Sequence, residues 1–202
     1  MKRLLALALI GLSGCGITGT SDDTGEGALS SAWNRYAQQD YDGALAAFTA
    51  LLDTGGLYPE ASEGQGWCQL MLGQATPAAL AFRQALLADD ERNSARVGEA
   101  FARRDSSPPD YPRVIQRARE ALRRDPDFRF SHDTHIDWRD LHLLMAQTFF
   151  YQQALDSSLV HCRAVDSGLT LSRTDTLSWG ASPTFELALF STLLELGSAT
   201  AP

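Results

Sequence analysis

Three of the four histidines of the chain lie close together in the sequence, with aspartates between them. His132, Asp133, His135 and Asp137 fall within six residues, and His142 follows one to two helical turns later. Imidazole and carboxylate groups bind zinc when three or four of them converge on one point. The spacing here matches no established ligand pattern such as H-E-x-x-H, so we predict no metal site and no cofactor. A metal- or ligand-binding segment at residues 128–137 is the alternative interpretation.

Arginine is concentrated in one part of an otherwise acidic chain. Residues 92–139 contain eleven arginines against eight acids, whereas residues 16–91 contain two arginines against eleven acids. The basic part includes a closely spaced set: Arg103, Arg104, Arg113, Arg117, Arg119, Arg123 and Arg124. Guanidinium groups bind carboxylates and phosphates, so Arg104, Arg113 and Arg117 are candidates for docking an acidic segment of a partner or an anionic polymer. A solvated helix face is the alternative, with Arg123 and Arg124 stabilising a helix C-terminus.

Nothing else in the composition indicates an enzyme or a nucleic-acid-binding protein. The sequence has no nucleophile motif, no phosphate-binding glycine loop and no obvious acid pair, and its glycines fall in linkers and turns. We therefore expect no catalytic residues. A formal net charge of −8 is repelled by the phosphate backbone, so we expect no nucleic-acid partner.

The first fifteen residues have the features of an export signal that ends at a lipid-attachment site. Lys2 and Arg3 give a positive start, and residues 4–12 are apolar but too few to span a bilayer. Residues 12–15, Leu-Ser-Gly-Cys, resemble the bacterial lipobox, which implies a signal peptide at residues 1–14, lipidation of Cys15 and a flexible linker to residue 27. An ordinary secretory signal with a chance cysteine is the alternative. Gly16 stands where an aspartate commonly retains such lipoproteins at the inner membrane, so the periplasmic face of the outer membrane is the expected location.

Aromatic and small residues recur at a fixed distance of 34 positions, and Trp33, Trp67 and Phe101 form one such column. The other columns are Ala32/Gly66/Ala100, Ala44/Ala78, Ala47/Ala81, Phe48/Phe82 and Leu52/Leu86. A 34-residue period of two helices and a turn resembles the tetratricopeptide repeat (TPR). The segment QDYDGALAAF at residues 39–48 and the A-L-x-x-D-P ending at residues 121–126 carry the same resemblance.

The resemblance implies an all-α fold, a right-handed α-α solenoid of about three to four TPR hairpins over residues 28–166. The fourth unit is degenerate and follows an insertion at residues 128–136, with Asp137 as the expected cap of its first helix. Residues 167–202 are predicted to form a loop and a C-terminal capping helix that begins near Ser182 and ends at Gly197. A generic helical bundle is the alternative, although a bundle has no reason to repeat at 34 residues.

Two cysteines follow Cys15, and each lies among apolar residues of a predicted helix. Cys68 and Cys162 are about two repeats apart, whereas a disulfide needs α-carbons within about 7 Å of each other. We therefore predict two buried free thiols.

First-helix residues of TPR proteins usually line a concave groove that receives a peptide or a helix, so the resemblance implies partner-binding roles for Trp33, Trp67 and Phe101. Packing between helices is the alternative, because these rings share a helical face with Leu29 and Leu70. The combined prediction is a non-enzymatic, lipid-anchored scaffold of the bacterial cell envelope that binds a protein or peptide segment. A periplasmic sensor lipoprotein that uses the 128–137 insertion is the alternative. The repeat does not encode the partner, the pathway or the oligomeric state.

Overall fold

The computed structural model describes residues 21–55 and 59–200, so the predicted signal peptide and Cys15 lie outside the described residues. The described residues form nine α-helices and a short 3-10 helix at Thr176–Trp179, and none of them belongs to a β-strand. The α-helices are α1 (Ser21–Ala37), α2 (Tyr41–Asp53), α3 (Pro59–Met71), α4 (Ala75–Ala88), α5 (Asn93–Asp105), α6 (Tyr111–Arg124), α7 (Trp138–Tyr151), α8 (Leu155–Val165) and α9 (Phe185–Thr200). None of these helices is long and apolar enough to cross a membrane.

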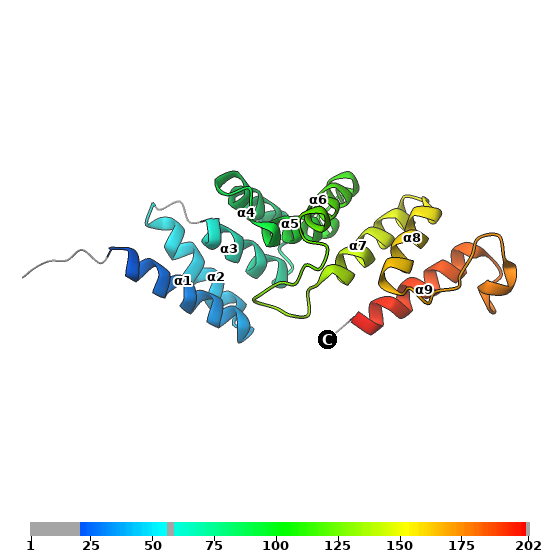
Figure 1. The fold of residues 1–202 in the computed structure, drawn as a ribbon. Helices are drawn as coiled ribbons and strands as arrows, with labels where there is room; N and C mark the ends of the chain where they lie inside the picture. The colour runs from blue at the N-terminus through cyan, green and yellow to red at the C-terminus, as the bar shows by residue number, and fades with distance from the viewer. Residues whose placement is uncertain (1–20, 56–58, 201–202) are drawn as a thin grey trace, which may run out of the picture.

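The helices pair into hairpins that stack in one direction (Figure 1). The hairpins α1–α2, α3–α4, α5–α6 and α7–α8 follow one another, and each helix up to α8 packs on the next. The first helices of successive hairpins also lie side by side, since α1 contacts α3, α3 contacts α5, and α5 contacts α7. Helix α9 covers the far end of the stack through contacts with α7 and α8. The predicted solenoid of three to four hairpins with a capping helix is confirmed.

The turns inside three of the four hairpins use the same backbone conformation. Gln39, Gly73 and Gln153 each precede a second helix and have φ angles of 62°, 73° and 59°. Glycine adopts this left-handed region freely, whereas for each glutamine it costs about 1 kcal/mol. Asp40 then accepts a hydrogen bond from the Gly43 backbone N–H and caps α2. The first, second and fourth hairpins thus share one turn geometry.

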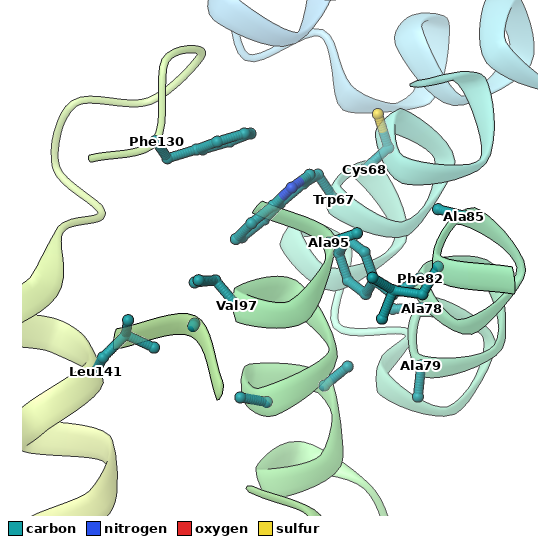
Figure 2. Packing of buried hydrophobic residues seen from close by; sticks show 14 of the residues in the cluster. Trp67, Cys68, Ala78, Ala79, Phe82, Ala85, Ala95, Val97, Phe130 and Leu141 are labelled. Carbon is teal, nitrogen blue, oxygen red and sulfur yellow. The ribbon is translucent and has the colours of Figure 1, made fainter. Parts of the chain in front are cut away.

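Large rings of the second helices pack directly on glycines of the following first helices. Phe48 is fully buried against Gly64, and Phe82 is fully buried against Gly98, where an added β-carbon would overlap the ring in both cases. Figure 2 shows Phe82 between α4 and α5, next to Ala78 and Ala95. These ring–glycine contacts set the distance between successive hairpins, because a larger residue would force the helices apart.

Three predicted element boundaries can be compared with the structure, and two of them differ. The linker prediction is wrong for residues 21–27, which belong to α1, because extending a helix that is already packed through Ala32 and Trp33 costs little once its nucleus exists. Helix α9 does not end at Gly197 but continues to Thr200. Its packing against α7 outweighs the low helix propensity of one glycine, which is about 1 kcal/mol. Asp137 caps α7 as predicted, in a reciprocal capping box with Asp140.

Both remaining cysteines are buried and free. Cys68 belongs to the larger core, which runs through the first three hairpins to α7, and Cys162 belongs to a second core under α9. Burial raises the pKa of Cys68 to about 12 and that of Cys162 to about 11, so both thiols stay protonated at neutral pH. The prediction of two buried free thiols is confirmed.

Candidate protein-binding surfaces

The tryptophans of the 34-residue column lie in the core. Trp67 is 0% exposed and Trp33 is 8% exposed, whereas Phe101 is half-buried beside the guanidinium of Arg104, 5.5 Å from the ring centre. Trp33 packs edge-on against Phe48. Packing between helices therefore accounts for both tryptophans, and a partner cannot reach Trp67 without displacing other side chains.

The cover over these rings is the segment between α6 and α7, residues 126–137, which we name the strap. The Phe130 ring stacks on Trp67 with the centroids 4.3 Å apart, and the His132 ring stacks on Trp33 at 3.7 Å. Figure 2 shows Phe130 pointing from the strap toward Trp67, with Val97 of α5 and Leu141 of α7 nearby. In Figure 1 the strap runs along the inner side of the curved row of helices. The chain thus fills the part of its own groove that the sequence suggested for a partner.

The strap is held to itself by backbone hydrogen bonds and to the groove by aromatic rings. The Phe130 N–H donates to the carbonyl of Ile136, and the Trp138 N–H donates to the carbonyl of Phe128. Phe128 and Phe130 are 4% and 1% exposed. Burial of the apolar area of each ring therefore contributes several kcal/mol to the free energy of unfolding.

The closely spaced histidines, on which the alternative of a metal- or ligand-binding segment depended, do not converge. His132 lies on Trp33, and burial with the nearby charge of Arg92 lowers its pKa. His142 instead faces His161 of α8, and Asp137 caps α7. Within the described part of the chain, no three His, Cys, Asp or Glu side chains are arranged to hold a metal ion.

One of the predicted docking arginines is part of a buried network. Arg117 donates to Glu99, which is 1% exposed, across 2.6 Å, and to Glu120 across 2.8 Å. Arg103 reaches the other oxygen of Glu99 at 3.3 Å. A buried carboxylate needs such partners, because an uncompensated buried charge is strongly destabilising. The guanidinium of Arg117 thus already binds two carboxylates of the chain itself, Glu99 and Glu120.

The uneven charge of the sequence is balanced across neighbouring hairpins. Arg92 pairs with the buried Glu63 of the preceding hairpin at 2.5 Å and with Glu60 at 2.6 Å. Arg124 likewise pairs with Glu91 at 2.7 Å. These acids therefore meet arginines about one repeat later, and the pairs join neighbouring parts of the stack.

Three arginines of α6 remain without a carboxylate partner in the described chain: Arg113, Arg119 and Arg123. Arg113 donates to the Gln116 side chain at 2.9 Å, and Arg119 lies over the Phe149 ring at 5.5 Å. Arg104, by contrast, pairs with its neighbour Asp105 at 2.6 Å. Three arginines without an ion pair thus lie on this one helix.

A groove of about 630 Å³ runs between α6 and the pair α7 and α8, and we name it the arginine groove. It is lined by Pro112, Ile115, Gln116, Arg119, Leu122, Arg123, His142, Met145 and His161. The Nδ1 atoms of His142 and His161 are 2.9 Å apart, so one ring donates to the other. Burial lowers the pKa of both imidazoles, and burial with the neighbouring His142 and Arg119 lowers that of His161 to about 4. Both rings are therefore neutral at pH 7.

A second cleft, of about 410 Å³, lies where the α5–α6 turn, α7 and α9 meet, and we name it the terminal cleft. It is lined by Arg104, Asp105, Tyr111, Gln147, Phe150, Tyr151, Phe190, Leu193 and Leu194. Leu187, Phe190 and Leu194 form an outward row on α9 and are 47%, 41% and 59% exposed. Of the three docking candidates chosen from sequence, Arg104 lies in this cleft, and none lines the arginine groove.

Sequence reasoning missed the main features of both surfaces. His161 lies in a degenerate repeat, so no register linked it to His142. The sequence of the C-terminal helix has apolar residues on nearly every side, so it does not show that Phe190 and Leu194 stay exposed. The alternation of Phe128, Phe130 and His132 in the insertion was the available signal for the strap.

No protein-family model matches the sequence, and no curated protein matches it either. Among solved structures, a crystal structure of MamA protein superposes with a TM-score of 0.61 and 13% identity, covering 87% of this chain and 93% of that one. TTC0263, a thermophilic TPR protein in Thermus thermophilus, superposes with a TM-score of 0.53 and 17% identity, covering 86% of this chain and 92% of that one. The chain therefore has the stacked-hairpin solenoid fold of TPR proteins.

Proposed function

We propose that this protein is a non-enzymatic scaffold that binds an apolar segment of a partner protein in its terminal cleft. The observation that carries the proposal is the exposed row on α9. This helix buries Leu189 and Leu193 against the stack but presents Phe190 and Leu194 to solvent beside Tyr151. Contiguous exposed apolar side chains next to a cleft are typical of protein-binding surfaces.

We further propose that the scaffold is anchored in a bacterial cell envelope by a lipid on Cys15. Support comes from the basic start, the short apolar stretch and the Leu-Ser-Gly-Cys sequence that precede the folded residues. Several acyl chains would anchor the protein stably, because each buried methylene contributes about 0.8 kcal/mol. Replacing Cys15 by Ser should move the protein from the membrane fraction to the soluble fraction of the envelope. Unchanged membrane retention of this variant would refute the anchor.

Site-specific photocrosslinking in the native envelope tests the partner. A photoreactive amino acid at Phe190 should yield one reproducible crosslinked protein, and the charge substitution Leu194→Glu should abolish that product. Leu177 gives the matched control, because it is 91% exposed and does not line the terminal cleft. Equal crosslinking from positions 190 and 177, or repeated recovery of the chain alone, would argue against the scaffold.

A further inference from the structure

We propose that the arginine groove binds an acidic amphipathic helix of the partner protein. The inference rests on the proposed scaffold function and adds a second contact of defined chemistry. It concerns a face formed by α6, α7 and α8, which shares no lining residue with the terminal cleft and includes no residue of the strap.

The groove holds two arginines without an ion pair, whereas most of the buried and half-buried arginines of the described chain have one. Arg92, Arg96, Arg103 and Arg117 each have a carboxylate within 4.0 Å. Arg119 and Arg123 are exposed, line the groove and have no ion pair among the described residues. A ligand with carboxylates would supply the missing partners.

The two arginines share one face of α6. They are four residues apart, so their β-carbons are about 6 Å from each other. The Arg119 guanidinium rests on the Phe149 ring of α7, which limits its freedom before a ligand arrives. Acids spaced three or four residues apart on a partner helix would match this spacing.

The floor of the groove is apolar. Ile115 and Leu122 are half-buried on α6, and Met145 of α7 is 1% exposed. His142 and His161 form the opposite wall as a neutral, mutually hydrogen-bonded pair, so they add no charge of either sign at pH 7. A groove of about 630 Å³ accommodates several apolar side chains of a helix, and methionine adapts well to such ligands.

A protein helix fits these features better than an anionic membrane does. The groove combines an apolar floor with only two unpaired cations, whereas stable attraction to anionic lipids needs a larger basic cluster. The chain as a whole carries a net charge of −8 and would be repelled by an anionic bilayer. We therefore assign the groove to a peptide helix, and vesicle binding is an outcome that would overturn the assignment.

A random 16-residue peptide library displayed on phage tests the inference with the full-length mature chain. We expect selected peptides to combine Asp or Glu at spacings of three or four with large apolar residues. A synthetic copy of the most enriched peptide, measured by fluorescence anisotropy, should bind at least tenfold more weakly to the Arg119→Glu/Arg123→Glu variant. The matched control is Arg83→Glu/Arg113→Glu, which changes net charge equally at exposed or half-exposed arginines outside the groove and should change affinity less than twofold.

The outcomes separate this inference from the function on which it rests. Selected peptides without acidic residues, equal loss in both double variants, or binding of the wild-type chain to phosphatidylglycerol vesicles that the groove variant loses would each overturn it. If peptides bind but only Leu194→Glu weakens them, the scaffold function stands and the groove assignment falls. If no peptide is enriched at all, both are refuted. Equal circular dichroism spectra and melting temperatures of the two double variants would show that any loss reflects the groove and not the fold.

Discussion

Replacing Phe130 by Ala should separate the strap from the groove and destabilise the first three hairpins. The ring is 1% exposed and stacks on Trp67 at 4.3 Å. A buried phenylalanine removes about 150 Å² or more from water, which at about 25 cal/mol per Å² corresponds to about 4 kcal/mol. Measured Phe-to-Ala losses in cores are about 3–5 kcal/mol. We therefore expect the free energy of unfolding to fall by about 4 kcal/mol.

Urea denaturation followed by circular dichroism measures this loss, and tryptophan emission reports its location. Removing Phe130 uncovers Trp67, so emission from the folded variant should shift to longer wavelength. Phe190→Ala is the matched control, because this ring is 41% exposed and should lose about 1 kcal/mol or less without an emission shift.

A loss below about 1 kcal/mol for Phe130→Ala would refute the reasoning, because it would mean that the strap does not contribute its buried area to the native state. An unchanged emission maximum would likewise contradict the stacking on Trp67. Either result would leave the inner face of the first hairpins open to a partner.

Three further substitutions test the buried charges, the histidine pair and the close helix contacts. Glu99→Gln should cost about 3 kcal/mol in denaturation experiments, because it removes the buried charge that pairs with the half-buried Arg103 and Arg117. Asp105→Asn, in a more exposed pair, should cost less than about 1 kcal/mol. Below pH 6.5 the unfolded state binds a proton at His161, whereas the folded state does not bind it until about pH 4. The free energy of unfolding should therefore fall as the pH is lowered from 6.5 to 4, by at most about 3 kcal/mol. The fall should be less steep in His161→Gln. Gly98→Ala should lower the melting temperature, because overlap with the Phe82 ring costs about 1–3 kcal/mol and outweighs the higher helix propensity of alanine. Gly197→Ala should raise the melting temperature, because the added β-carbon is at an ordinary packing distance and only the gain in helix propensity remains.

The repeat made the scaffold predictable from sequence. Residues of one column, such as Phe48 and Phe82, make equivalent contacts with the next hairpin. Their spacing therefore predicts both the helices and the direction of stacking. The capping role of Asp137 was predictable for a similar reason, since a cap depends on residues within one turn. The companion column of Gly64 and Gly98 obeys the same period and could have been found by the same reasoning.

The candidate surfaces were not predictable in this way. Trp33 and Trp67 have the positions of groove residues, yet Phe130 covers Trp67 from 63 positions along the chain, and an insertion belongs to no repeat register. Arg117 and Arg119 are alike in sequence, but only Arg117 meets a buried carboxylate.

Sequence alone therefore determined the hairpin architecture and its period, because these follow from contacts within one or two repeats; the export signal stays a prediction. Tertiary structure decided which aromatic rings are core, which arginines are neutralised and where the stack stays open. The burial of a ring and the pairing of an arginine depend on contacts between segments that are distant in the sequence. Such contacts form only after the hairpins have stacked.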